Sequence, residues 1–244
     1  MSKEKIRSIK ELGKCRGGIK PITAFIICTA LIMLYASCSN SYRAEEEVPD
    51  NGGGIHLASD EFVEGLANTE GEVTTRFYTN DPKYWGLNGT TLWTVWGLEA
   101  PTDAFVEREV MMSKAKGDVS AGYGLVICQG ERQVEGAAEK TMLVVMINNK
   151  GEYTIGKVIG GLYEVIEWWT ANAALNAGAG VPNRIKVRKE SGAYVVYAGS
   201  IEITRFVDDE EPIHNGGRNG YVVVISSLDR LPTDEVDVLF TEKK

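Results

Sequence analysis

Apolar and polar positions alternate in short segments through the second half of the chain, and glycine-containing turns separate the segments. Alternation with a period of two places successive side chains on opposite faces of a strand. Turn signals recur at the spacing of about 8–12 residues that is typical of antiparallel sandwiches and barrels. Strands are predicted at residues 122–128, 141–147, 153–158, 162–169, 184–188, 194–198, 201–207, 221–226 and 236–241. The pattern therefore predicts an all-β fold.

The part of the chain before residue 122 has a weaker strand pattern. Residues 55–57 fit a first edge strand, residues 73–78 alternate cleanly, and residues 105–112 fit a strand better than a helix. We therefore expect residues 55–244 to form one domain, which is long enough to bury a sizeable core.

A family resemblance is carried by the motifs of the second half. Trp168 and Trp169 lead into a loop of small and polar residues that ends at Asn183, a hairpin follows at 194–206, and Gly-Gly-Arg-Asn-Gly stands at 216–220. This order resembles the concanavalin A-like, laminin G-like and glucanase-like jelly-roll domains of bacterial envelope proteins. The resemblance implies an antiparallel β-sandwich of the jelly-roll kind. It implies no particular activity, because one fold hosts many functions.

The N-terminus has the anatomy of a secretory signal peptide. Residues 1–20 are basic, and residues 21–37 contain no charged residue. A positive region, a short apolar region and small residues before a cleavage site are the three parts of such a signal. Residues 1–37 are therefore predicted to be a signal peptide, which places the folded domain outside the cytoplasm.

The end of this segment resembles a bacterial lipobox. Ala36 and Ser37 precede Cys38, and the resemblance implies that Cys38 is lipidated and becomes the mature N-terminus. Tyr35 departs from the leucine that is usual at its position, and an uncleaved membrane anchor is the alternative. The resulting expectation is a lipoprotein of the bacterial cell envelope, attached to the outer membrane or the cell surface by its lipid.

Residues 38–54 are predicted to be a flexible tether between the lipid and the domain. Three consecutive glutamates at 45–47 and three glycines at 52–54 make this segment polar and turn-prone. Such a composition buries too little apolar surface to fold by itself.

Charge excludes one class of partner. The chain has a formal net charge of −8 although residues 1–20 are basic, so the remainder is strongly acidic. Phosphate-rich partners are repelled by such a surface, and we expect no nucleic acid partner. Membrane attachment is expected through the lipid anchor rather than a basic patch.

The chain has four cysteines, and they leave no intrachain disulfide. Cys15 and Cys28 lie in the signal peptide, Cys38 is the predicted lipidation site, and only Cys128 remains in the domain. Cys128 is interpreted as a small buried hydrophobic residue rather than a reactive thiol.

Aromatic side chains are the candidate ligand-binding residues, because an indole ring stacks on the apolar face of a sugar. Trp85, Trp93 and Trp96 form one cluster; the alternative is that one or two of them fill an end of the core. Trp169 is a further candidate for ligand binding. Of the adjacent Trp168 and Trp169, one is expected in the core and the other outside or under the loop at 170–182, since neighbouring strand residues face opposite ways.

Two asparagines of the loop at 170–182, Asn172 and Asn176, are further candidates for ligand binding. Loops on a rigid scaffold often carry recognition. The alternative is that Asn172, Asn176 and Asn183 bind backbone groups of the loop.

Catalytic and metal sites have weaker support. Glu107 and Glu109 share a face about 7 Å apart by strand rise, but the Glu-x-Asp-x-(x)-Glu signature of concanavalin-like glucanases is absent. His56 and His214 lack metal-ligand spacing, so zinc is not expected. The run Asp208, Asp209, Glu210 and Glu211 is either a solvated loop or a calcium site. No other cofactor is predicted.

The sequence therefore favours a non-catalytic envelope lipoprotein with a lectin-like jelly-roll domain that binds carbohydrate. A structural or adhesive lipoprotein that contacts envelope proteins through its acidic surface is the first alternative. A glycoside hydrolase is the second.

Overall fold

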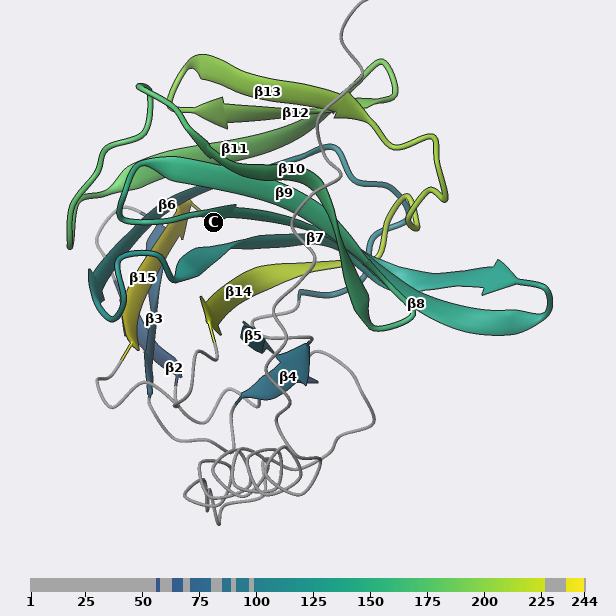
Figure 1. The fold of residues 1–244 in the computed structure, drawn as a ribbon, viewed down its shortest axis with the longest axis horizontal. Helices are drawn as coiled ribbons and strands as arrows, with labels where there is room; N and C mark the ends of the chain where they lie inside the picture. Colours follow the sequence, from purple (N-terminus) through teal and green to yellow (C-terminus); the bar gives the residue numbers. More distant parts are fainter. Residues whose placement is uncertain are drawn as a thin grey trace, which may run out of the picture. The chain divides into compact units, whose positions relative to one another are not determined.

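The computed structural model describes residues 56–57, 63–67, 71–79, 85–88, 91–96, 99–226 and 236–243, and these residues contain β-strands but no helix. Accordingly, no helix that could cross a membrane is found in the described part of the chain. Two layers of strands face each other (Figure 1). The predicted signal peptide, Cys38 and the tether lie outside the described residues.

The first layer, sheet A, has the order β1-β5-β14-β7-β8-β9-β10, with β4 paired to β5. Its strands are β1 (His56–Leu57), β4 (Gly86–Asn88), β5 (Thr91–Trp96), β7 (Gly122–Val134), β8 (Ala137–Ile147), β9 (Glu152–Ile159), β10 (Leu162–Ala171) and β14 (Arg218–Ser226). All pairs are antiparallel except the short contact between β1 and β5. Strands β7 to β10 form a meander, and β14 returns from the end of the chain to join β5 to β7.

The second layer, sheet B, has the order β13-β12-β11-β6-β15-β3-β2 and is antiparallel throughout. Its strands are β2 (Val63–Ala67), β3 (Glu72–Thr79), β6 (Glu107–Lys116), β11 (Asn183–Glu190), β12 (Ala193–Ala198), β13 (Ile201–Val207) and β15 (Val236–Lys243). Here β15 is the late strand that joins β3 to β6. These long crossovers and the two facing sheets confirm the predicted antiparallel β-sandwich.

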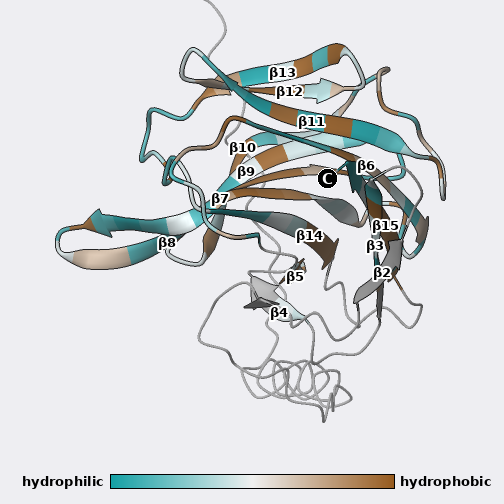
Figure 2. Ribbon diagram, turned by 180° about the vertical axis from the view of Figure 1, so that it is seen from behind, coloured by the Kyte–Doolittle hydropathy of each residue, from teal (hydrophilic) through white to brown (hydrophobic). Residues whose placement is uncertain are grey.

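The core lies between the sheets, where the alternating pattern directs the apolar side chains. Strand β6 shows the alternation: Val110 and Met112 are buried, whereas Glu107 and Glu109 are exposed. Figure 2 shows the same change between hydrophobic and hydrophilic residues along β11. Burial of apolar side chains is the source of most of the stability, because the described residues form no disulfide.

Strands β7 and β8 are longer than the sequence pattern predicted. Their pairing continues from Gly130 with Thr141 to Val134 with Ala137, past the point where β14 and β9 cover them. The turn at Glu135 and Gly136 has positive φ at both residues, as a type I′ hairpin turn requires. This hairpin arm extends from the sandwich (Figure 1) and is mostly exposed. Apolar and polar residues alternate only where one face of a strand is buried, and the arm is mostly exposed. The sequence pattern therefore did not predict the arm.

Cys128 is buried, as predicted, and it sits in a β-bulge. Its backbone has a φ of 57°, and its amide donates to the Asn219 side chain at 3.1 Å. Pairing between β7 and β8 shifts register between Ile127 and Gly130 at this point. Burial raises the pKa of the Cys128 thiol, which keeps the sulfur protonated and inert.

Lys114 is a charged side chain within the core. Its ammonium donates to the carbonyl oxygens of Asp118 and Ala121, each at 2.5 Å, and lies 5.4 Å from the centre of the Tyr123 ring. It closes the turn between β6 and β7. Burial lowers the pKa of Lys114 to about 8, although the Asp118 carboxylate acts in the opposite direction.

This lowered pKa predicts a pH-dependent stability. Below pH 8 the native and unfolded states both carry the Lys114 proton, and the cost of burying the charge is fully present. Between about pH 8 and 10.5 only the unfolded state keeps the proton, so stability rises with pH. Urea unfolding of the protein and of Lys114→Met at pH 7.5 and 9.5 measures this effect. We expect the stability of the variant relative to the wild type to fall at the higher pH; a constant difference would contradict the assignment.

Candidate functional site

A second apolar cluster covers the outer face of sheet A, opposite the core. It consists of nine buried residues from five strands: Trp93, Val95, Val126, Met142, Val144, Met146, Val158, Val222 and Val224. Tyr163 of β10 packs against them. An apolar outer face is unusual for an antiparallel sheet, which commonly presents one face to water. The cluster itself is buried, so a site on this face lies at its exposed rim.

One end of the outer face is closed by an aromatic contact. The rings of Trp93 and Tyr163 lie 4.9 Å apart, although β5 and β10 are separated by four strands. In a flat sheet these two strands would be about 24 Å apart, so sheet A must curl strongly. Gly156 makes room for the curl, because a Cβ there would lie 2.4 Å from the Tyr163 ring. Trp93 is consequently buried beneath Tyr163.

The other end of the outer face carries an exposed tryptophan pair. The Trp169 indole lies over Gly122 and Met146, since a Cβ on Gly122 would meet both side chains at 3.1 Å. Trp169 is 37% exposed and Trp168 is 74% exposed. The alternation at Gly122, Tyr123 and Gly124 places the two glycines on the outer face, so the indole packs on Gly122 next to the Met146 side chain.

The expectation that one of these tryptophans is in the core is wrong. Pairing between β10 and β9 shifts register between Glu167 and Thr170, where three steps on β10 face two steps on β9. The extra residue is a β-bulge, which interrupts the alternation of faces. Both indoles therefore reach the surface of the edge strand.

The expected binding roles of Trp85 and Trp96 are corrected by their burial. Each is 1% exposed and lies in the core between the sheets. The Trp96 ring stacks on Phe77 at 4.6 Å, and the Trp85 ring meets the same phenylalanine edge-on at 5.7 Å. Trp93 is also 1% exposed, although it belongs to the outer face. None of the three presents a ring to a ligand.

The asparagines of the loop after β10 hold its backbone. Asn172 accepts from the Ala174 amide at 2.9 Å, and Asn176 donates to the Pro182 carbonyl at 3.1 Å. Asn183 accepts from the Asn176 amide and donates to its carbonyl oxygen. These bonds match the structural alternative, in which the asparagines replace missing strand partners. They fix the loop that follows the tryptophan pair.

Glu107 and Glu109 do not form a catalytic pair in this structure. Glu109 accepts from Arg184 at 2.8 Å, and Glu107 lies 3.5 Å from Arg188. All four side chains are more than a third exposed on the outer face of sheet B. Exposed ion pairs of this kind are ordinary surface features.

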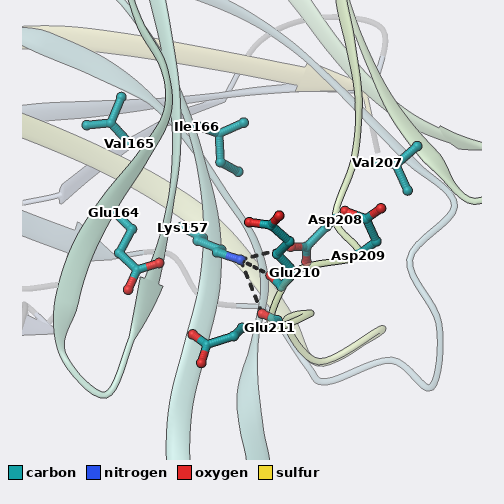
Figure 3. A pocket seen from close by; sticks show the side chains of 9 residues that line it. All are labelled: Lys157, Glu164, Val165, Ile166, Val207, Asp208, Asp209, Glu210 and Glu211. Carbon is teal, nitrogen blue, oxygen red and sulfur yellow. Dashed lines mark hydrogen bonds and ion pairs between the residues drawn. The ribbon is translucent and has the colours of Figure 1, made fainter.

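A groove separates β10 of sheet A from the segment after β13 of sheet B (Figure 3). It has a volume of about 430 Å³ and contains the acidic run that was considered for calcium. The Lys157 ammonium occupies the position that a cation would take: it lies 3.2 Å from Asp208, and it donates to the carbonyl oxygens of Glu210 and Glu211. Asp208 also accepts from the Ile213 amide at 2.8 Å. This loop is therefore held by an internal cation.

No group of three or more histidine, cysteine or acidic residues suited to a metal ion occurs among the residues that the structure describes. Sequence reasoning had not singled out Tyr163 or Lys157. Tyr163 is the second residue of a predicted strand that begins after two glycines. This position gives no indication that Tyr163 contacts Trp93 at the opposite edge of the sheet. Lys157 acts on residues more than fifty positions away, which no local pattern records.

Comparisons with known proteins show the fold. No protein-family model and no curated protein matches the chain. Among solved structures, a Bacteroides ovatus GH16 protein of a mixed-linkage glucan locus, in complex with a G4G4G3G product, has a TM-score of 0.51 at 7% identity, over 79% of this chain and 89% of that one. The carbohydrate binding module CBM66 from Bacillus subtilis has a TM-score of 0.43 at 12% identity, over 74% and 91% of the two chains. A Bacillus licheniformis beta-glucanase has a TM-score of 0.43 at 9% identity, over 78% and 86%. The two-sheet antiparallel sandwich of this chain is a concanavalin-like jelly roll.

Proposed function

We propose that this chain is a non-catalytic, lectin-like lipoprotein of the bacterial envelope that binds carbohydrate at the exposed tryptophan pair of β10, at the rim of the outer face of sheet A. The observation that carries the proposal is the exposed pair Trp168 and Trp169. Large exposed aromatic rings are costly in water and mark binding surfaces. The Trp169 indole packs on Gly122 next to Met146 and still exposes part of its ring, and an exposed apolar ring is the partner that the apolar face of a sugar requires.

The surroundings of the pair support binding rather than catalysis. The apolar cluster beneath it contains only aromatic, aliphatic and methionine side chains. Glycoside hydrolysis requires two carboxylates across the scissile bond. Glu167, the nearest acidic residue on β10, is already engaged: it accepts from the Tyr153 and Thr204 hydroxyls. The Bacteroides ovatus protein with this fold holds an oligosaccharide product, so the fold accommodates glycans.

Titration calorimetry of the full chain with neutral oligosaccharides and muropeptide fragments tests the proposal. We expect Trp169→Ala to weaken binding about tenfold or more, since one lost stacking contact corresponds to at least 1.4 kcal/mol. Leu162→Ala is the matched control, because Leu162 is an exposed apolar residue at the other end of β10. Equal losses in both variants, or unchanged affinity in Trp169→Ala, would contradict the proposal.

The lipid anchor is the second part of the proposal. It rests on the charge pattern of residues 1–37 and on the lipobox-like sequence that ends at Cys38. Cells grown with radiolabelled palmitate are expected to label the wild-type protein and not a Cys38→Ser variant, because the variant has no thiol to which lipid can be attached. Absence of label in the wild type, or equal label in the variant, would contradict lipidation at Cys38.

A further inference from the structure

Two strand edges lie open on the same side of the sandwich. β10 and β13 are the last strands of sheets A and B, so one edge of each is uncovered by any described strand. The sheets are joined near these edges, where the Thr204 hydroxyl donates to Glu167 at 2.8 Å. An open edge carries unpaired N–H and C=O groups that can pair with another chain.

The first four residues of the open edge of β10 lack three features that block such pairing, namely lysine, proline and a β-bulge. The strand contains no lysine and no proline. Its first residues, Leu162 to Val165, pair regularly with β9 before the first register shift. Leu162 is 68% exposed and Ile166 is also exposed. The regular part of this edge is therefore a suitable template for an added strand.

The groove described above runs beside this same part of β10. Val165 and Ile166 line one side, and Val207 and Asp209 line the other (Figure 3). The groove thus combines apolar walls with a strand edge. Its volume of about 430 Å³ lies within the range of binding pockets.

The acidic side chains of the groove determine which charge a bound segment must carry. Glu164, Asp209 and Glu210 line it, and none of the three carboxylates has an ion-pair partner among the described residues. Lys157 is the one basic residue in the lining, and its charge is taken up by Asp208 and by backbone carbonyls. The groove therefore attracts cations and repels acidic segments.

We propose that this groove binds an extended basic segment of a partner protein, which adds as a strand to the edge of β10. Successive side chains of an added strand point to opposite faces. An alternating segment would place its apolar side chains against Val165, Ile166 and Val207, and its lysines or arginines beside Glu164, Asp209 and Glu210. This site is separate from the tryptophan pair and does not depend on sugar binding.

A blocked octapeptide of alternating lysine and valine is the probe, and calorimetry with the full chain measures its Kd. We expect Asp209→Asn with Glu210→Gln to weaken binding about tenfold or more, because two opposing charges are lost. The control is Asp103→Asn with Glu135→Gln, which removes the same charge from exposed positions outside the groove and is expected to leave the Kd within twofold. Equal effects of the two double variants, or no binding of the probe to the wild type, would overturn the proposal.

Three altered peptides distinguish strand addition from binding by charge attraction alone. N-methylation of alternate backbone amides removes the donors of one peptide edge and keeps all charges. Strand addition predicts that methylation on one edge abolishes binding and that methylation on the other does not. A glutamate and valine peptide should not bind. Equal binding of both methylated peptides, or binding of the acidic peptide, would contradict the proposed mode.

Discussion

Replacing Trp96 with alanine is expected to lower the free energy of unfolding by about 3–5 kcal/mol, the usual cost of removing a large aromatic side chain from a core. The Trp96 ring stacks on Phe77 at 4.6 Å and contacts Phe240 at 5.4 Å and Tyr221 at 5.6 Å. Its removal leaves a cavity between the sheets where β3, β5, β14 and β15 meet. Single domains are stable by only about 5–15 kcal/mol, so this variant approaches the limit of folding.

Trp168→Ala is the matched control for this prediction. It removes the same side chain from a position that is 74% exposed, and we expect a change within about 0.5 kcal/mol. Urea unfolding followed by circular dichroism gives both values. A small loss in Trp96→Ala, comparable to that of the control, would show that Trp96 is accessible and would restore it as a candidate for sugar binding.

Replacing Lys157 with methionine is expected to cost about 3–5 kcal/mol of stability, because it leaves a buried carboxylate without its partner. The Asp208 side chain is 5% exposed and lies 3.2 Å from the Lys157 ammonium. The same ammonium holds the carbonyl oxygens of Glu210 and Glu211. Loss of this one cation therefore removes three of the contacts that hold the segment after β13, while the contacts of Ile213 with Asp208 and of Arg132 with Glu211 remain.

A double-mutant cycle isolates this ion pair. Asp208→Asn in the Lys157→Met background removes the unpaired charge, while the amide can still accept from the Ile213 amide. The double variant should therefore be more stable than Lys157→Met alone. Purely additive losses would mean that the two side chains do not act on each other.

The fold could be predicted from the sequence because alternation and turn spacing depend on local residues alone. Each strand predicted after residue 122 is present. The hairpin arm was missed because its side chains are exposed on both faces, so alternation no longer records burial. The curl of sheet A was missed as well: it brings Trp93 to Tyr163, and only the completed sheet shows that these residues meet.

The candidate site was predicted in part. Trp169 was predicted to be a ligand-binding residue, and its indole is 37% exposed. Exposure of both neighbouring tryptophans was missed, because one bulged residue interrupts the alternation of faces along β10. Trp93 and Trp96 face opposite sides, as their spacing predicts, but both faces of sheet A are buried at β5. Aromatic content alone therefore could not separate core residues from surface residues.

The central claim is that the exposed indoles of β10 bind sugar, and the indole N–H signals of the five tryptophans test it most directly. We expect a saturable shift of the Trp168 and Trp169 signals in nitrogen-15-labelled protein during titration with neutral oligosaccharides and muropeptide fragments. The signals of the three buried tryptophans should stay in place. Shifts confined to Trp85, Trp93 and Trp96, or no shift with any sugar of the panel, would contradict the proposed function.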